Sequence, residues 1–266
     1  MDDLVFITGA TGGLGKAMAA ECASRGWDLY LTDLRRDRLA TLATGLERSY
    51  GVHVLYEEAD LTSSASRMHL FEKLGRDGVR FRGLINVAGT DHEGLFLERR
   101  PEEIIAILRL NIEATLVVTH ALISCRDQAV PFRIINVSSL AAFFSMPVKA
   151  TYAASKRFLL DFSLALRNEL RDQNVTVTVL CPAGLPTNES CIAAIESQGI
   201  FGQLTTEDIG KVAHQTIEAA LRGEAVVIPG FLNRLARWLG GLLPAASMAE
   251  IVGSRWRLVQ QRRLSA

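Results

Sequence analysis

The sequence predicts a doubly wound α/β fold, in which helices cover both faces of a parallel sheet, and three observations favour it. Short runs rich in β-branched residues alternate with longer amphipathic segments along most of the chain. A glycine-rich turn joins the first run to the first amphipathic segment. The chain has 266 residues, of which 48% are hydrophobic, and this is enough for one sizeable core. Strands that alternate with helices form right-handed βαβ units, and such units build a parallel sheet.

Seven strands and six helices are predicted from the hydrophobic periodicity. The strands are short runs that begin at Leu4, Asp28, Val52, Gly83, Phe132, Val175 and Ala225. The helices have apolar residues three or four positions apart and span residues 14–25, 38–48, 67–76, 101–124, 152–171 and 206–222. Residues 1–230 therefore form one predicted α/β domain, and residues 231–266 form a C-terminal helical extension.

The composition is that of a protein with balanced charge. Lys plus Arg and Asp plus Glu number 29 each, so the net charge gives no reason to expect nucleic acid as a partner. Four scattered cysteines without CxxC spacing are typical of reduced thiols in a cytoplasmic protein. The acidic start MDDLVF has no basic n-region, and we expect neither an export signal nor a membrane-spanning segment. The five histidines lack metal-ligand spacing, so we predict no metal site.

The stretch FITGATGGLGKAMA places three spaced glycines between the first strand and the first helix. Gly9 permits a tight turn, Gly13 lets the backbone approach a pyrophosphate, and Gly15 lets helix and strand pack closely. The N-terminus of the helix supplies free N–H groups and a positive dipole end to the phosphates. The loop alone could be a purely structural turn, but its strand–turn–helix context indicates a dinucleotide site.

Asp33 ends the second strand, about 20 residues beyond the loop, where a carboxylate accepts hydrogen bonds from adenosine ribose hydroxyls. The same carboxylate repels a 2′-phosphate, so Asp33 favours NAD over NADP. Arg35 and Arg36 could grip that phosphate, and the alternative interpretation is that they begin a solvated helix. We favour the second interpretation and predict NAD as the cofactor.

Tyr152 and Lys156 are four residues apart in a predicted helix, so they share one face. A nearby ammonium favours phenolate and lowers the pKa of the phenol, which makes a proton donor and acceptor for neutral pH. On these two residues alone, a pair exposed on the surface is the competing interpretation.

Five motifs in order and spacing resemble the short-chain dehydrogenases/reductases. They are Thr8-Gly9-x-x-x-Gly13-x-Gly15, NVAG at 86–89, Asn111, Ser139 and Tyr152-x-x-x-Lys156. The resemblance covers residues 4–229 and points to the NAD(P)-dependent subdivision of roughly 250 residues. It implies a Rossmann fold and an oxidoreductase that acts on CH–OH groups.

The resemblance also implies a catalytic set. Tyr152 would be the general acid and base, and Lys156 would lower the pKa of Tyr152 and hold the nicotinamide ribose. Ser139 would bind the substrate oxygen, whereas Ser138, its neighbour on the strand, should point the other way. Asn111 would anchor a water that leads to Lys156 and completes a proton relay.

The cofactor contacts implied by the resemblance extend along the chain. Asp60 would meet the adenine edge, and residues 86–89 would line the adenosine side. In CPAGLPTN the family's glycine is displaced by one residue, and Leu185 and Thr187 would orient the carboxamide. The complete predicted set is Thr8, Gly9, Gly13, Leu14, Gly15, Asp33, Asp60, Leu61, Asn86, Ala88, Gly89, Tyr152, Lys156, Leu185 and Thr187.

The segments expected to flank the nicotinamide are apolar, namely 94–97, 141–147 and 191–201, and they contain no basic cluster. They favour a small hydrophobic alcohol, ketone or aldehyde as substrate, with the loop after Thr187 as a lid. Residues 91–94, DHEG, are interpreted as a solvated loop.

The extension has Leu232, Leu235, Trp238 and Leu239 at helical spacing. Across residues 231–266, six arginines and one acid, Glu250, give a formal charge of +5. One interpretation is a helical pair packed on the sheet edge, the lid or a neighbouring subunit. The other is a basic amphipathic patch in peripheral contact with an anionic membrane.

The sequence thus predicts a cytoplasmic homodimer or homotetramer that interconverts a secondary alcohol and a ketone or aldehyde with NAD(H). Two alternatives remain open. One is an NADP-dependent carbonyl reductase of small polar substrates. The other is a non-catalytic NAD-binding sensor or scaffold, which would not need the complete set of Asn111, Ser139, Tyr152 and Lys156.

Overall fold

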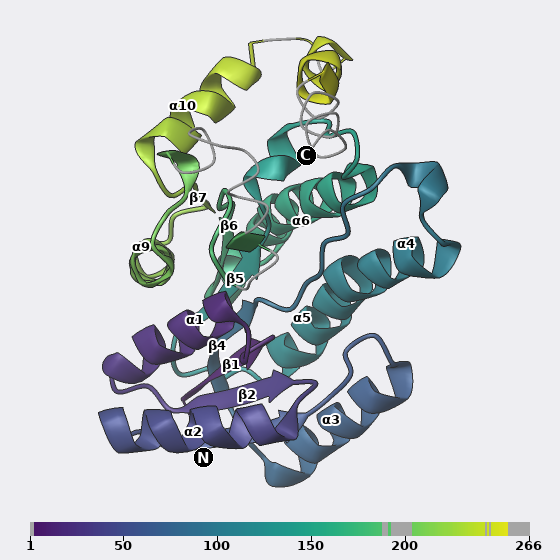
Figure 1. The fold of residues 1–266 in the computed structure, drawn as a ribbon. Coiled ribbons are helices and arrows are strands. Elements are labelled where there is room, and N and C mark those ends of the chain that lie inside the picture. The colour runs from purple at the N-terminus through teal and green to yellow at the C-terminus, as the bar shows by residue number, and fades with distance from the viewer. Residues whose placement is uncertain (1–2, 188–190, 193–203, 243, 245, 255–266) are drawn as a thin grey trace.

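A computed structural model describes residues 3–187, 191–192, 204–242, 244 and 246–254. Seven parallel strands form one sheet in the order β3-β2-β1-β4-β5-β6-β7 (Figure 1). The helices α1, α2 and α9 lie on one face, and α3 to α6 lie on the other. The predicted doubly wound α/β fold is confirmed.

Every predicted strand is present in the sheet. The strands are β1 (Leu4–Thr8), β2 (Leu29–Asp33), β3 (Val54–Glu58), β4 (Phe81–Asn86), β5 (Phe132–Val137), β6 (Val175–Leu180) and β7 (Val226–Val227). The strand order reverses between β1 and β4, and ligands of such sheets bind beyond the carboxyl ends of the strands at this point. Thr8, Asp33 and Asn86 are the last residues of their strands, so all three lie at that edge.

The helices follow the predicted spans within a few residues. They are α1 (Gly13–Ser24), α2 (Arg36–Tyr50), α3 (Ser64–Asp77), α4 (Pro101–Leu108), α5 (Thr115–Ser124), α6 (Ala150–Glu169), α9 (Ile209–Leu221) and α10 (Phe231–Gly240). Short 3-10 turns add η1 (Phe96–Glu98), η3 (Leu140–Phe143) and η4 (Arg171–Gln173). The predicted division at residue 230 falls between β7 and α10, and it stays a prediction.

The long helix predicted over residues 101–124 is interrupted by a π-helical turn, η2 (Arg109–Ala114), which the periodicity did not predict. This turn contains Asn111, and π-turns inside α-helices are frequent at functional sites. By length and composition alone the stretch Pro101–Ser124 could cross a membrane, contrary to our expectation from the sequence. A core helix passes the same test, and here Val118 and Leu122 pack in the core beneath the sheet.

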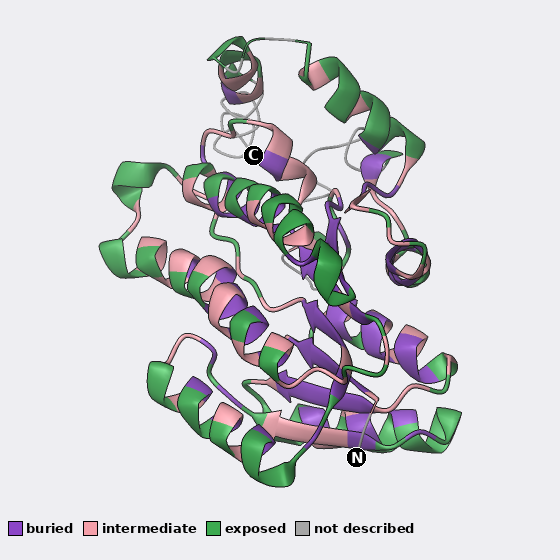
Figure 2. Cartoon of the chain, turned by 180° about the vertical axis from the view of Figure 1, so that it is seen from behind, coloured by how far each residue is buried: buried purple, intermediate pink, exposed green. Residues whose placement is uncertain are grey.

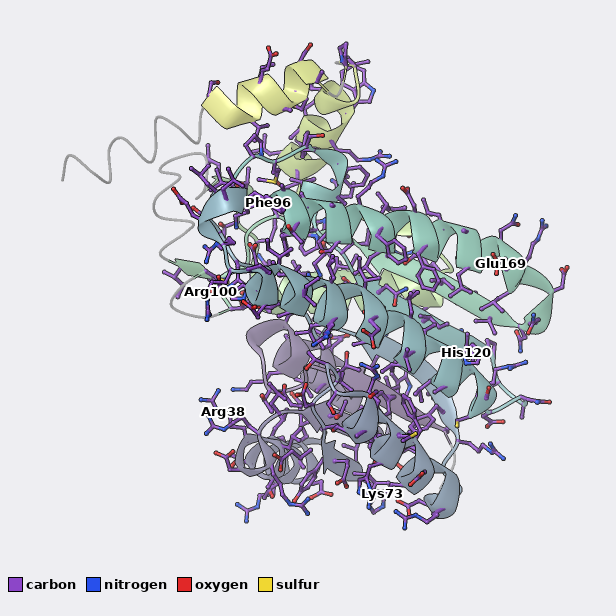
Figure 3. All side chains as sticks on the ribbon, turned by 90° about the vertical axis from the view of Figure 1, so that its right-hand side faces the viewer. Arg38, Lys73, Phe96, Arg100, His120 and Glu169 are labelled. Carbon is purple, nitrogen blue, oxygen red and sulfur yellow. The ribbon has the colours of Figure 1, made fainter. Side chains whose placement is uncertain are left out.

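The sheet has a hydrophobic core on each face. One core joins β1 and β2 residues such as Ile7 and Leu31 to α1, α2 and α9, and the other joins Phe6 and Phe81 to α3 and α5. Figure 2 shows the buried strands between partly exposed helices. Charged side chains such as Arg38 and Glu169 lie on the outer helix surfaces (Figure 3). The rigid sheet thereby holds the loops at its carboxyl edge in fixed positions.

Candidate active site

The glycine loop brings backbone segments closer together than side chains would allow. Gly9 has a φ of +63°, and a Cβ there would lie 2.8 Å from the Cα and N atoms of Ala88. A Cβ on Gly15 would overlap the carbonyl oxygen of Gly9. The hydroxyl of Thr8 accepts hydrogen bonds of 3.1 Å from the N–H groups of Val87 and Ala88. The loop and the segment after β4 are therefore fixed side by side.

The N-terminus of α1 has the properties of an anion site. Its N-cap is Gly12, and among the described residues no side chain caps the helix and no acid lies in its first turn. Leu14 and Gly15 are buried in this turn. Beside them, the backbone of Gly13 lies close to the backbone of Thr187. Free N–H groups at the positive end of a helix bind phosphate well. The residues present fit the pyrophosphate of a dinucleotide.

Asp33 is oriented toward this loop. One carboxylate oxygen accepts the N–H of Thr11 at 2.9 Å, and the other accepts the N–H of Leu34 at 2.7 Å. Each carboxylate oxygen has a further lone pair, so the group can also accept hydrogen bonds from ribose hydroxyls. The negative charge is thus held at the place where the adenosine ribose of a bound dinucleotide is expected.

The two arginines after Asp33 have other contacts. Arg35 forms an exposed ion pair of 3.0 Å with Asp37. The guanidinium of Arg36 lies 5.9 Å from the ring centre of Tyr56. Both arginines therefore lie at the start of α2 with partners of their own, in agreement with the solvated-helix interpretation.

Three further residues were predicted to contact the adenosine part of the cofactor. In the structure, each of their side chains has a different environment. The carboxylate of exposed Asp60 accepts two hydrogen bonds from Thr62, at 2.8 and 2.7 Å. Leu61 is buried. The Asn86 side chain points into the interior and donates to Thr119 at 3.0 Å and Asn136 at 2.9 Å. Only the backbone of Asn86 can therefore face a cofactor.

The two adjacent serines after β5 point in opposite directions, as the alternation along a strand predicts. The Ser138 hydroxyl is buried and donates to the carbonyl oxygen of Lys156 at 2.6 Å. The Ser139 hydroxyl accepts the N–H of Ala141 at 3.1 Å, and its side chain lies close enough to Tyr152 to lower the pKa of the phenol. Ser139 and Tyr152 therefore face one shared position.

Lys156 and Asn111 lie behind this pair. The Lys156 ammonium donates to the carbonyl oxygen of Val137 at 2.9 Å and lies 5.7 Å from the ring centre of Tyr152. The Asn111 side chain accepts a hydrogen bond from the N–H of Thr90 and donates to the carbonyl oxygen of Thr90 and to the hydroxyl of Ser155. A Cβ on Gly89 would lie 3.2 Å from Asn111 Oδ1 and 3.3 Å from Lys156 Nζ, so this glycine keeps the space between them free.

The protonation properties of the pair differ from our expectation. Burial raises the pKa of the Tyr152 phenol above its ordinary value, and the nearby Ser139 side chain opposes this only in part. Burial lowers the pKa of Lys156 to about 8, while the charge of Asp91 opposes the change. The predicted lowering of the Tyr152 pKa by Lys156 is therefore wrong for the protein alone, because lost hydration disfavours the phenolate and the negative charge of Asp91 adds to this effect.

A second lysine beside Tyr152 was missed in the sequence. The Lys149 ammonium lies 5.7 Å from the Tyr152 ring centre and forms ion pairs with Asp91 at 2.5 Å and Glu93 at 3.7 Å. The DHEG segment is an irregular loop with Asp91 and His92 exposed, as predicted, and ion pairs of its two acids tie it to the start of α6. The three-residue spacing of Lys149 and Tyr152 was the available signal.

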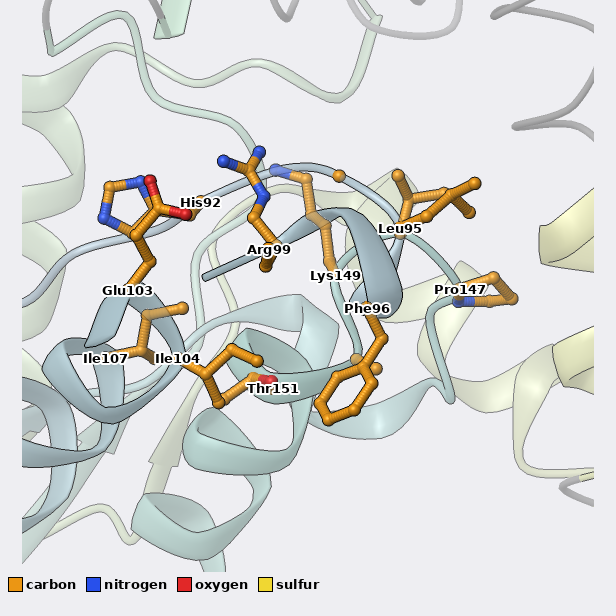
Figure 4. A pocket seen from close by; sticks show the side chains of 13 residues that line it. His92, Leu95, Phe96, Arg99, Glu103, Ile104, Ile107, Pro147, Lys149 and Thr151 are labelled. Carbon is orange, nitrogen blue, oxygen red and sulfur yellow. The ribbon is translucent and has the colours of Figure 1, made fainter. Parts of the chain in front are cut away.

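A cavity of about 250 Å³ lies at the start of α6, where Lys149, Ala150 and Thr151 line it (Figure 4). Its described lining does not include Ser139, Tyr152 or Lys156. Its lining includes apolar side chains from η1 and α4 and from the turn before α6, namely Leu95, Phe96, Ile104, Ile107 and Pro147. His92, Arg99, Glu103 and Lys149 add polar groups. The predicted apolar segments at 94–97 and 141–147 both contribute to it, and most of the third segment, residues 193–201, lies outside the described residues.

Leu185 and Thr187 lie where the chain leaves β6. Leu185 is buried, and its carbonyl oxygen accepts the N–H of Thr187 at 2.8 Å. The Thr187 hydroxyl contacts the sulfur of Cys191 at 3.3 Å. A Cβ on Gly13 would lie 2.8 Å from the Thr187 Cα, so this segment directly borders the glycine loop.

Residues 3–190 match the short chain dehydrogenase family. The chain belongs to this family. Like other members, it is an NAD(P)-dependent dehydrogenase/reductase. The match spans the glycine loop, the Ser139–Tyr152 pair and Lys156, so the predicted family is confirmed.

Among characterised relatives, human 17-beta-hydroxysteroid dehydrogenase type 3 is 30% identical over 90% of this chain and 77% of its own length. A very-long-chain 3-oxoacyl-CoA reductase of Laccaria bicolor is 33% identical over 64% of this chain but only 51% of its own length. A sulfoacetaldehyde reductase of Chromohalobacter salexigens is 34% identical over 68% of this chain and 72% of its own length.

Solved structures are similar over nearly the whole chain. A short-chain dehydrogenase from Sphingobium yanoikuyae in complex with NADPH has a TM-score of 0.79 and 29% identity, and the match covers 97% of this chain and 95% of that chain. A short-chain dehydrogenase/reductase from Burkholderia phymatum in complex with NAD has a TM-score of 0.78 at 23% identity, covering 90% of this chain and 92% of that chain. Similar folds thus bind either nucleotide.

Proposed function

We propose that this protein interconverts a hydrophobic alcohol and the corresponding carbonyl compound, a ketone from a secondary alcohol or an aldehyde from a primary one, with NAD(H). The observation on which the proposal rests is the cluster of Ser139, Tyr152 and Lys156, in which the Lys156 ammonium lies 5.7 Å from the Tyr152 ring centre and Ser139 lies close enough to influence the phenol. A binding protein has no use for an acid aligned with a second hydroxyl, and this weighs against the sensor or scaffold alternative.

The residues can perform the proton transfer of such a reaction. A bound nicotinamide supplies or accepts the hydride. In the reducing direction the Ser139 hydroxyl holds the substrate oxygen by a hydrogen bond, and Tyr152 donates its proton to that oxygen. The raised pKa of Tyr152 keeps the phenol protonated at neutral pH. The gap at Gly89, between Asn111 and Lys156, is where a proton relay would pass.

The preference for NAD is proposed from Asp33. Its carboxylate is held toward the glycine loop by the N–H of Thr11. A 2′-phosphate beside this carboxylate would meet like charge, while Arg35 is paired with Asp37. Electrostatics at this position therefore favour the ribose hydroxyl of NAD.

A hydrophobic substrate is supported by two observations. The cavity at the start of α6, next to Thr151 in the chain position before Tyr152, has an apolar lining that includes Phe96, Ile104 and Pro147. Two relatives are named for a steroid and for a very-long-chain acyl substrate. A membrane contact of the extension would suit such substrates. We also propose that the protein works in the cytoplasm as a homodimer or homotetramer.

A second candidate is the reduction of a small anionic carbonyl compound. The apolar lining does not favour it, but two basic residues do. Arg99 and Lys149 both line the cavity, although Lys149 is paired with Asp91 and Glu93. The similarity to a sulfoacetaldehyde reductase agrees with this candidate.

The test is to measure turnover with NADH and NADPH separately against two panels. One panel is ketones and alcohols graded by chain length, and the other is small anionic aldehydes. We expect NADH to support turnover that rises with apolar chain length. Turnover only with anionic aldehydes would favour the second candidate. Tight NADH binding without turnover on either panel would favour the sensor alternative.

A further inference from the structure

Helix α10 has its apolar face turned away from the protein. Six large apolar residues on α10 and just after it have between 39% and 70% of their surface exposed. They are Phe231, Leu232, Leu235, Trp238, Leu239 and Leu242, and we call them the apolar stripe. Most of them are three or four positions apart, so they lie on one side of the helix.

The opposite side of α10 faces the protein and is polar or small. Asn233 is 1% exposed. The guanidinium of Arg237 lies 4.8 Å from the ring centre of Phe143, and Gly240 lies against Phe144. A surface helix normally buries its apolar stripe, whereas α10 buries Asn233 and leaves the apolar stripe exposed together with Arg234 and Arg237.

Hydrogen bonds hold α10 in this orientation. The buried amide of Asn233 donates to the carbonyl oxygens of Thr205 at 3.1 Å and Pro229 at 2.8 Å. Arg234 donates to the carbonyl oxygen of Ile228 at 3.3 Å. Rolling the helix to bury the stripe would break these bonds and leave buried polar groups unpaired. The exposure of the stripe is therefore fixed by specific hydrogen bonds. A contiguous exposed apolar surface of this kind indicates a binding partner.

Charge identifies the kind of partner. Residues 231–266 have six arginines and one glutamate, a formal +5, and because the whole chain nets zero, residues 1–230 have −5. Arg234 and Arg237 belong to α10, and the other four arginines lie outside the described residues. The charged residues of α10 are Arg234 and Arg237, so two stripes facing each other would bring like charges together, which is unfavourable. An anionic lipid surface is complementary both to the exposed apolar stripe and to the positive charge. A central Trp beside arginines is typical of helices at the bilayer interface.

We propose that the apolar stripe of α10 docks the protein on the surface of an anionic lipid bilayer. The inner side of α10 contacts η3, which begins directly after Ser139. Docking through α10 therefore brings the lipid surface close to the segment that positions the catalytic serine. The docking does not depend on the proposed reaction, because it involves no residue of the catalytic set.

The test is flotation of the full-length protein with vesicles of phosphatidylcholine, with and without phosphatidylglycerol. We expect binding to the anionic vesicles that weakens as salt increases. Because burial of an aromatic side chain contributes about 1.5–3 kcal/mol, Trp238→Ser should weaken vesicle binding by about tenfold or more. Met68→Ser is the matched control, since Met68 and Trp238 are both 61% exposed and Met68 lies on α3.

Three results would overturn the proposal. The first is an absence of binding to anionic vesicles at low salt, and the second is unchanged binding by Trp238→Ser. The third is a wild-type dimer in sedimentation velocity that Trp238→Ser dissociates, since a second copy would then cover the stripe. Because these measurements need no substrate, their failure is distinguishable from failure of the proposed reaction.

Discussion

The cofactor end and the substrate end of this protein share one edge of the sheet but are built differently. At the cofactor end, backbone meets backbone, as where Gly9 approaches Ala88 and Gly15 approaches Gly9. At the substrate end, side chains from distant segments meet, as where Lys149 pairs with Asp91 and Arg237 covers Phe143. The backbone geometry of the glycine loop is typical of doubly wound folds that bind a dinucleotide, whereas side-chain surroundings differ with each substrate.

This difference explains which part of the function can be predicted from the sequence. The cofactor and the reaction class follow from residues whose spacing is dictated by the dinucleotide and by proton transfer. The substrate follows from loops and from α10, whose contacts depend on how the chain folds back on itself. Variants that damage one end and leave the other intact can test this separation.

The largest effect is expected at the cofactor end, from Gly15→Ala. The added Cβ would overlap the Gly9 carbonyl oxygen, so strand and helix must move apart. We expect loss of NADH binding in a fluorescence titration. Gly75→Ala in α3 is the control, because a Cβ there meets open space, and it should be neutral or stabilise by up to about 1 kcal/mol. Normal NADH binding by Gly15→Ala would refute the close-approach argument.

Tyr152→Phe should distinguish most clearly between an effect on turnover and an effect on cofactor binding. Removing the hydroxyl deletes the proton donor and leaves the ring in place, so turnover should fall by about 100-fold or more. NADH affinity should change little. Tyr50→Phe, at an exposed site of α2, serves as the control. Near-normal turnover of Tyr152→Phe would exclude it as the general acid.

Within α10 itself, Asn233→Ala and Trp238→Ala should differ strongly in stability. Loss of the buried amide leaves two carbonyl oxygens without their donor, and we expect a decrease of about 1–3 kcal/mol in the free energy of unfolding. Trp238 is exposed, so its replacement should change stability by less than about 0.5 kcal/mol. Denaturant titration measures both, and equal losses would mean that the stripe is part of the core.

Asp33→Asn should alter cofactor choice without abolishing binding. The amide oxygen can still accept the N–H of Thr11, but the charge that repels a 2′-phosphate is gone. We expect the ratio of NADPH to NADH dissociation constants to fall by about tenfold, equivalent to about 1.4 kcal/mol. Asp161→Asn, in an exposed ion pair on α6, is the control. An unchanged ratio would show that Asp33 does not select the nucleotide.

The smallest effect is a shift in pH dependence. Burial lowers the pKa of Lys156 to about 8, so its charge is present below that pH and is lost above it. We expect kcat/KM for NADH, which reports the free enzyme, to fall as pH rises through about 8. Asp91 raises the pKa of Lys156, so Asp91→Asn should move this fall to lower pH. Asp127→Asn is the control, and a shift to higher pH would contradict the assignment.

Much of the fold and part of the site were predictable because they depend on local pattern. β-branched runs give strands, and residues four apart share a helix face, which places Tyr152 beside Lys156. Strand alternation separates Ser138 from Ser139 in the same way. Asn86 shows the limit, because its motif position gave no sign that its side chain would bond Thr119 and Asn136 in the interior.

By itself, the sequence determined the order of strands and helices, the positions of the close glycines and the residue types available for proton transfer. Only the tertiary structure decided which faces are covered. It paired Lys149 with Asp91 across 58 residues of chain, and it turned the apolar stripe of α10 outward by fixing Asn233 inside. Periodicity states which residues share a face, but whether that face meets the core or the solvent depends on contacts between segments distant in sequence.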